Sequence, residues 1–171
     1  RIPDFEDVEV AAARLKGQAV VTPLLEYPEL NERLGARLLI KPENLQRSGS
    51  FKFRGAYNRV SAIPEDVRAR GVIAFSSGNH AQGVAAAAKI HGIPATIVMP
   101  SDAPRIKIGN TQAYGAKVVT YDRFTEDREA IAAAISAETG ATLIKPYDDT
   151  LIIAGQGTCG LEIAQQARAA G

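Results

Sequence analysis

The chain has 171 residues, of which 46% are hydrophobic and 23% charged, a composition typical of a soluble globular protein rather than a disordered one. Its 20 basic and 19 acidic residues give a net charge of +1 without any long run of Lys or Arg, so nucleic acid is not an expected partner. No apolar stretch reaches the roughly 20 residues that span a bilayer, and the N-terminus does not resemble a signal peptide. We therefore expect no membrane partner and a cytoplasmic location.

Cysteine and histidine are too few for a disulfide or a metal cluster. Cys159 is the only cysteine, so an intrachain disulfide cannot form. The two histidines, His80 and His91, do not make a recognisable metal-binding set, and no metal ligands are expected in this chain. Aromatic residues are also too few for stacking on bases. The expected partner is a small molecule.

The N-terminal residues predict two helices and one strand. An amphipathic helix is expected from Asp4 to Lys16, with Asp4 as its N-cap. Residues 29–34 predict a shorter helix that Gly35 ends. The following residues 37–41 (RLLIK) are typical of a strand.

From residue 51 onward, predicted helices and short apolar strands alternate. The expected strands are residues 72–76, 96–99, 117–121 and 142–144, and the expected helices are 51–61, 64–70, 79–91, 105–114, 125–139 and 158–170. Strands that are apolar throughout indicate parallel strands covered by helices on both faces. The predicted fold class is therefore α/β.

A lysine lies in the first turn of the helix predicted over residues 51–61, directly after the Ser/Gly loop 48–50. The N-terminus of a helix carries unpaired N–H groups and partial positive charge, which disfavour a protonated amine. Because Schiff-base chemistry needs a neutral amine, Lys52 is a candidate for covalent catalysis. Lysines at helix starts are common, however, and a solvated structural residue is the more frequent alternative.

Residues 76–83 (SSGNHAQG) follow a predicted strand and open an alanine-rich helix. Sheets of this class place ligands at the carboxyl ends of their strands. Gly78 permits close approach of the backbone, and the free N–H groups of the helix can bind a carboxylate or phosphate. The hydroxyls of Ser76 and Ser77 and the amide of Asn79 add donors and acceptors. The alternative is that one serine merely caps the helix.

Residues 155–160 (GQGTCG) are rich in glycine and precede the last predicted helix. A phosphate could bind such a turn, but the segment lacks both the Gly-x-Gly-x-x-Gly pattern and the Gly-Lys-Ser/Thr of a P-loop. A structural turn at the start of that helix is favoured.

Taken in order, these segments resemble the fold-type II pyridoxal-phosphate (PLP) enzymes, and most closely the serine/threonine dehydratase and serine racemase family. The matching segments are TPL (22–24), KPENLQ (41–46), SGSFKFRGA (48–56), SSGNHAQG (76–83), IPA (93–95), YGA (114–116) and IAGQGT (153–158). Matches in this order are specific, so the resemblance favours a functional role for Lys52. It implies the fold of the tryptophan synthase β-like PLP enzymes.

The resemblance implies a role for each matched residue of the site. Lys52 would hold PLP as a Schiff base and remove the α-proton of the substrate. Phe51 would line the cofactor ring, and Asn79 would hydrogen-bond its 3′-oxygen. The substrate carboxylate would be held by Ser76, Ser77, Gly78, Asn79 and His80. In the racemases, a serine matching Ser77 protonates the opposite face of the α-carbon.

The implied function is a PLP-dependent dehydratase (ammonia-lyase) that converts L-threonine, L-serine or a similar 3-hydroxy amino acid to a 2-keto acid and ammonia. Serine racemase remains an alternative, and so does a 3-hydroxyaspartate dehydratase. The latter needs an additional cation for the side-chain carboxylate, and the sequence places Arg54, Arg105 and Lys107 too loosely to decide whether one of them supplies it. A last alternative is a non-catalytic fragment that needs a complementary half.

The resemblance also implies a domain division. Residues 1–50 would begin a large PLP-binding domain, 51–70 form the cofactor-lysine helix and a linking segment, 71–146 form a small inserted α/β domain, and 147–171 return to the large domain. The family's phosphate loop, the partner of the pyridine nitrogen and a divalent cation site would lie outside this chain. We therefore expect an incomplete fold, the N-terminal half of such an enzyme, and a homodimer for the complete protein.

Overall fold

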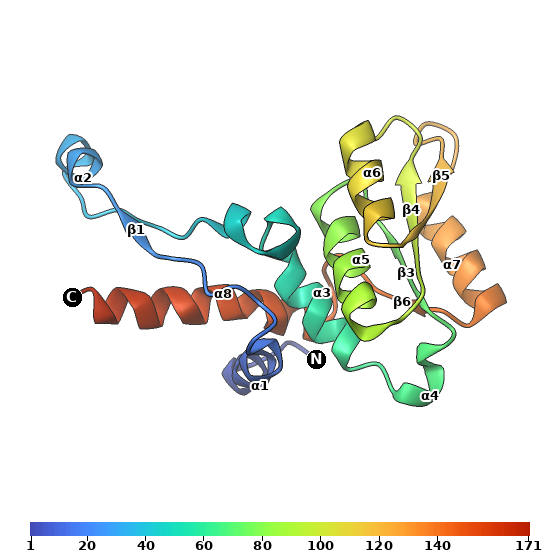
Figure 1. Ribbon diagram of the computed structural model, residues 1–171, viewed down its shortest axis with the longest axis horizontal. Coiled ribbons are helices and arrows are strands. Elements are labelled where there is room, and N and C mark those ends of the chain that lie inside the picture. The colour runs from blue at the N-terminus through green and yellow to red at the C-terminus, as the bar shows by residue number, and fades with distance from the viewer.

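The computed structural model describes residues 1–171 and consists of a sheet-containing part and a helical part, which meet along α3 (Figure 1). The elements in chain order are α1 (Phe5–Leu15), β1 (Leu25–Glu26), α2 (Pro28–Leu34), β2 (Leu39–Ile40), the 3-10 helices η1 (Glu43–Leu45) and η2 (Arg47–Gly49), α3 (Lys52–Ser61), α4 (Glu65–Arg68), β3 (Val72–Phe75), α5 (Asn79–His91), β4 (Ala95–Pro100), α6 (Arg105–Ala113), β5 (Lys117–Tyr121), α7 (Arg128–Thr139), β6 (Thr142–Leu143) and α8 (Thr150–Ala169).

The sheet has four parallel strands in the order β5-β4-β3-β6. Side chains of β3 alternate between its two faces: Val72 and Ala74 join the core under α5, whereas Ile73 and Phe75 join a second core under α7. Helices thus cover both faces of the sheet (Figure 1), which confirms the predicted α/β class. The sheet lies within residues 71–146, and the division into domains at those residues stays a prediction.

The helical part consists of α1, α3 and α8, with α3 lying between α5 and α8. Where α3 crosses α8, two glycines allow the backbones to touch: a Cβ added to Gly155 would lie 2.6 Å from Gly55 Cα. Because helices approach this closely only where side chains are absent, the two glycines position α3 on α8.

The C-terminal helix begins earlier than the sequence predicted. Asp149 caps α8, its carboxylate accepting from Leu151 N at 2.9 Å and Ile152 N at 3.1 Å. Residues 155–160 therefore lie inside the helix, and the expected turn at its start was wrong. The glycines there serve packing, since a Cβ on Gly157 would lie 2.8 Å from Val8 Cγ2 of α1.

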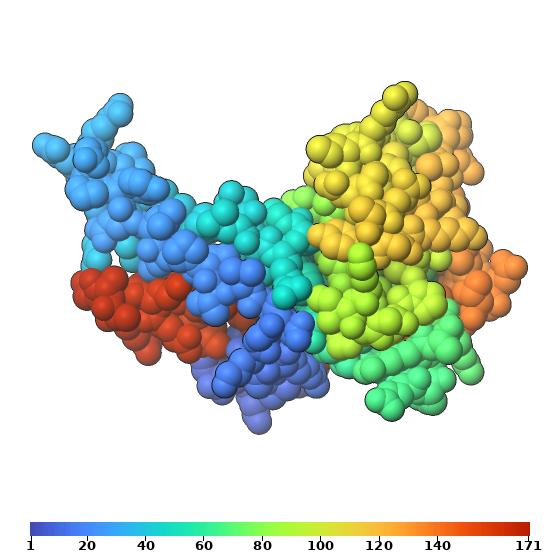
Figure 2. Space-filling view, in the orientation of Figure 1, coloured from blue at the N-terminus to red at the C-terminus, as the bar shows by residue number.

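Residues 25–40 form an arm that stands apart from the sheet-containing part, and residues 41–50 connect the two (Figure 2). The strand predicted over residues 37–41 is limited to β2, which pairs antiparallel with β1, a strand that the sequence did not predict. Arg37 ties the arm together by an ion pair with Glu26 at 2.9 Å. No helix of the chain combines the length and the apolar character needed to cross a membrane.

Candidate active site

Lys52 is the first residue of α3, as the sequence predicted, and its side chain is half-buried. Its Nζ donates a hydrogen bond to the backbone oxygen of Pro146 at 3.0 Å and lies 5.5 Å from the centre of the Phe51 ring. The ion pairs of the chain all involve other cations. The amine therefore has a polar neighbour that orients it, and no carboxylate forms an ion pair with it.

The start of α5 follows directly after the carboxyl end of β3. Its N-cap, Gly78, makes no side-chain capping bond. Ser76 Oγ accepts from Gly78 N at 3.1 Å, so this serine closes the turn before the helix rather than capping it. Ser77 and Asn79 are exposed. The N–H groups of the first turn of α5 are thus not satisfied by a side-chain cap, as an anion site requires.

His80 is only 3% exposed and is held as a neutral ring. Burial lowers its pKa from the ordinary 6.5 to about 4, and the nearby charge of Lys52 acts in the same direction. Its Nε2 lies 3.1 Å from Ile144 O, and because a carbonyl only accepts, Nε2 carries the proton. The buried Nδ1 has no partner. The side chain thus bonds to the backbone that follows β6.

The starts of α3 and α5 lie against each other. A Cβ added to Gly83 on α5 would lie 3.2 Å from the backbone carbon and oxygen of Lys52. Lys52 is also close enough to His80 to affect its pKa. The fold therefore brings the predicted lysine and the predicted anion site to one place, although they are far apart in the sequence. The side chain of Phe51, which directly precedes Lys52, is 43% exposed.

Two residues with strained backbones flank the same place. Ser48 (φ 59°) and Asp148 (φ 48°) are the non-glycine residues with positive φ. Ser48 lies in the loop before Lys52, and Asp148 follows closely after Pro146. The hydroxyls of Ser48 and Ser50 are buried without hydrogen-bond partners. Strained backbone and unpaired buried polar atoms both concentrate at functional sites.

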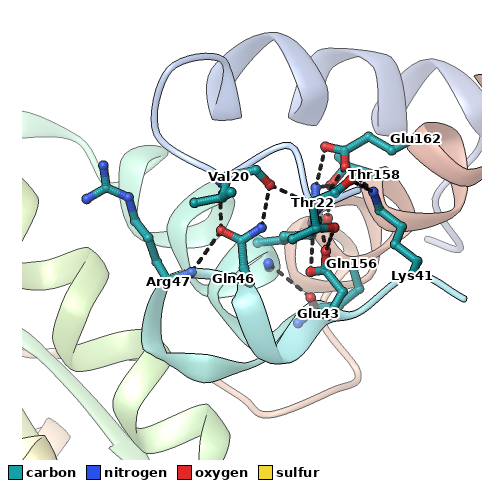
Figure 3. A network of polar contacts seen from close by, with 12 residues as sticks. Val20, Thr22, Lys41, Glu43, Gln46, Arg47, Gln156, Thr158 and Glu162 are labelled. Atoms are coloured by element: carbon teal, nitrogen blue, oxygen red, sulfur yellow. Dashed lines mark hydrogen bonds and ion pairs between the residues drawn. The ribbon is translucent and has the colours of Figure 1, made fainter. Parts of the chain in front are cut away.

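A buried ionic cluster lies on the other side of α3 (Figure 3), and the sequence did not predict it. Arg54 is fully buried and contacts Glu43 at 2.8 Å and Glu162 at 2.7 Å, and Lys41 contacts Glu162 at 2.8 Å. Burial disfavours the charge of Arg54, but its hydrogen bonds to the two carboxylates outweigh this and raise its pKa. Burial likewise opposes the charges of Glu43 and Glu162, yet their bonds to Arg54 lower their pKa values.

This cluster narrows a choice of substrate-binding cation that the sequence left open. Because Arg54 already binds two carboxylates, it is not available to a carboxylate of a substrate. The only signal for the cluster was the presence of charged residues inside otherwise apolar segments, such as Lys41 and Glu43. No group of three or more His, Cys, Asp or Glu side chains is placed to hold a metal ion.

Lys107 on α6 brings a positive charge to the start of α5. Its Nζ donates to Asn79 Oδ1 at 3.3 Å and would lie 3.3 Å from a Cβ added to Gly78. Both Lys107 and Asn79 line an open groove of about 700 Å³ between η2, α5 and α6. Arg105, the other candidate cation, is exposed on the first turn of α6.

With this geometry in place, comparison with known proteins identifies the family. The sequence pattern of the family described as "Pyridoxal-phosphate dependent enzyme" matches residues 15–170. The chain belongs to this family. It is 51% identical to an L-threo-3-hydroxyaspartate ammonia-lyase of Saccharomyces cerevisiae over 96% of its own length and 51% of the relative's. It is 48% identical to an L-threonine ammonia-lyase of Thermotoga maritima over 94% of this chain and 40% of that one.

The fold agrees with a solved structure of the same family. Maize serine racemase superposes with a TM-score of 0.95 at 38% identity, covering 98% of this chain and 51% of that chain. The family members similar to this chain thus include both ammonia-lyases and racemases. The chain spans about half the length of the curated relatives that it matches.

Proposed function

We propose that the protein is a PLP-dependent dehydratase that converts L-threonine, L-serine or a similar 3-hydroxy amino acid to a 2-keto acid and ammonia. The observation that carries the proposal is the amine of Lys52, half-buried, bonded to one backbone oxygen and adjacent to the uncapped start of α5. Membership of the family supports the cofactor, and the names of the relatives support the class of substrate.

The side chains around Lys52 fit the aldehyde end of PLP. A covalent bond to the cofactor needs an amine without a tight ionic partner, and Lys52 has none. Unpaired buried atoms, namely Ser50 Oγ and His80 Nδ1, offer further polar groups on the elements that meet there. Asn79 would hydrogen-bond the 3′-oxygen, and Phe51 would line the ring.

The start of α5 would hold the carboxylate of the substrate. Its free N–H groups and the positive end of its dipole attract an anion, and Gly78 lets the anion approach the backbone. Ser76, Ser77, Asn79 and the backbone of His80 surround this point in the sequence. A carboxylate bound there would fix the amino acid beside Lys52 and orient its α-proton.

Lys52 would then move the proton. PLP, when bound, supplies the electron sink for the charge left at the α-carbon. The released amine of Lys52 would take the α-proton, while its bond to Pro146 O limits where the nitrogen can lie. The β-hydroxyl would leave as water with the proton that Lys52 has accepted, and hydrolysis of the nitrogen-bearing product would release ammonia and the 2-keto acid.

Ser77 is the residue on which the balance between dehydration and racemisation would depend. Its hydroxyl is exposed at the same strand end and would deliver a proton to the opposite face of the α-carbon. Incubating the PLP-loaded protein with L-serine, and measuring 2-keto acid and D-serine together, tests the proposal. We expect 2-keto acid as the main product. D-serine without 2-keto acid would contradict the dehydratase, and no turnover of either kind would favour a non-catalytic fragment.

A second candidate substrate is 3-hydroxyaspartate, because Lys107 places a cation without an ion-pair partner at the start of α5, where it donates to Asn79. A relative of this activity is 51% identical to the chain. Lys107→Met would then lower kcat/KM for L-threo-3-hydroxyaspartate about 10- to 100-fold, as expected for losing a charged hydrogen bond, and that for L-threonine less than about twofold.

Lys89→Met is the matched control for this experiment, since Lys89 lines the same groove but donates only to Ala113 O at 3.3 Å. It should leave both substrates unaffected. Equal losses for both substrates in the Lys107 variant would remove this lysine from substrate selection.

A further inference from the structure

Two side chains of the candidate site bind the same short stretch of backbone. His80 of α5 donates from Nε2 to Ile144 O at 3.1 Å, and Lys52 of α3 donates from Nζ to Pro146 O at 3.0 Å. We call residues 144–146 the carbonyl segment. Its two acceptors are provided by alternate residues, and the donors come from two different helices. The segment therefore links the starts of α3 and α5 through the backbone.

The carbonyl segment is anchored at both ends. Ile144 N donates to Ile73 O at 2.8 Å, which continues the pairing of β6 with β3, and the Ile144 side chain is fully buried. Beyond the segment, Asp149 caps α8 and pairs with Arg59 at 2.9 Å. The position of Pro146 O thus depends on these anchors and on what Ile144 O binds.

The only side chain that satisfies Ile144 O is the buried ring of His80. A backbone oxygen that loses its donor inside a protein keeps the cost of desolvation without the bond, so the local backbone turns or moves to find another partner. Any such movement of Ile144 carries Pro146 with it, and Pro146 O is the acceptor of Lys52.

We propose that Pro146 O is the resting acceptor for the amine of Lys52 whenever the amine is not bound to the cofactor, and that His80 is a positioning residue that keeps this acceptor in place. The proposal rests on the proposed role of Lys52 as the PLP lysine. Four rotatable bonds separate Nζ from the backbone, so a fixed acceptor narrows the positions of the nitrogen. One N–H bonded to Pro146 O leaves the lone pair of a neutral amine free to react.

Two substitutions of similar chemistry test the role of His80. Glutamine carries its amide nitrogen the same number of bonds from Cα as Nε2, so His80→Gln can still donate to Ile144 O. Asparagine is one bond shorter, so His80→Asn cannot reach that oxygen. Both replace the ring by an uncharged amide at a site that is 3% exposed. The two variants therefore differ mainly in whether residue 80 can donate a hydrogen bond to Ile144 O.

The measurement is the rate at which the full protein, freed of cofactor, forms a borohydride-stable adduct with added PLP at Lys52, mapped by peptide mass spectrometry. We expect His80→Gln to react within about twofold of the unaltered protein. His80→Asn should react about tenfold more slowly, equivalent to about 1.4 kcal/mol. Adduct formation at the exposed groove residue Lys89 provides the internal reference and should be the same in all variants.

Val84→Ala serves as a structural control, because Val84 is fully buried on α5 in the same core as Ile144, and its truncation loosens this packing without removing a hydrogen bond to the carbonyl segment. If His80→Asn reacts at the native rate, or if Val84→Ala is slowed as much as His80→Asn, the positioning role of His80 is overturned. An unaltered protein without any adduct at Lys52 would overturn the proposed function first, and this proposal with it.

Discussion

Lys52 and Arg54 lie in the same turn of α3, and their surroundings are opposite in kind. Arg54 is fully buried, and its guanidinium donates to both Glu43 and Glu162. Lys52 is half-buried and donates to one backbone oxygen. One helix thus carries a guanidinium that two carboxylates bind and, two residues away, a lysine that no carboxylate binds.

This difference separates the stability of the fold from its chemistry. Arg54 joins α3 to the loop before it and to α8, but its donors are occupied and it has no capacity for a ligand. We expect Lys52 to contribute little to the stability of the fold, because it makes one hydrogen bond and no ion pair. The ionic cluster therefore fixes the position of α3, and with it the position of Lys52.

The largest expected effect on stability is from Arg54. Arg54→Met would leave Glu43 without an ion-pair partner and Glu162 with Lys41 alone, in a largely buried place, and would lower the free energy of unfolding by about 3–5 kcal/mol. Lys52→Met, in the same turn, should change it by less than about 1 kcal/mol. Urea unfolding of both variants measures this contrast, and equal losses would break the distinction between the two cations.

A smaller effect on stability comes from the buried imidazole of His80, which lies near Lys52. The folded pKa of His80, about 4, lies below the ordinary 6.5, so the unfolded chain binds the proton first as the pH falls. The contribution to stability is therefore complete above pH 6.5 and is lost as the pH falls toward 4. Between pH 7 and pH 5 we expect a loss of about 2 kcal/mol.

His80→Gln should remove most of this pH dependence, leaving the part due to His91, whose pKa burial also lowers. Thermal unfolding at several pH values in this range measures it. The same slope in the variant and in the unaltered protein would show that His80 is not buried in its neutral form.

A third effect, similar in size to the second, concerns the contact that places α3 on α8. A Cβ at Gly155 would lie 2.6 Å from Gly55 Cα, so Gly155→Ala must separate the helices and should cost about 1–3 kcal/mol. Gly160, in the same helix, has no other atom within 4 Å of a Cβ, so Gly160→Ala should stabilise α8 by up to about 1 kcal/mol. Denaturation midpoints that shift alike in both variants would exclude the close crossing.

The sheet and its helices were predictable because they depend on local patterns. The strand over residues 117–121 and the helix over residues 79–91 have the predicted bounds, since apolar periodicity and glycine stops determine both. The start of α8 was not predictable in this way. Glycines that allow close helix packing look, in a sequence, like the glycines of a turn that precedes a helix.

The candidate site divides in the same manner. The position of Lys52 at a helix start could be predicted, but physical reasoning from the sequence could not distinguish it from an ordinary surface lysine, and only the resemblance to a family did so. Its acceptor Pro146 is 94 residues away, and Arg54 and Glu162 are 108 residues apart. Contacts between residues so far apart arise from the tertiary fold, so the local spacing of residues in the sequence does not predict them.

The central claim is that Lys52 carries the cofactor. The most direct test is borohydride reduction of the PLP-loaded protein, followed by proteolysis and mass mapping of the modified peptide. We predict that the pyridoxyl group is found on Lys52, and that Lys52→Ala lacks both the adduct and the visible absorbance of the bound cofactor. An adduct on Lys41, Lys89 or Lys107 instead, or unchanged absorbance in Lys52→Ala, would contradict the account.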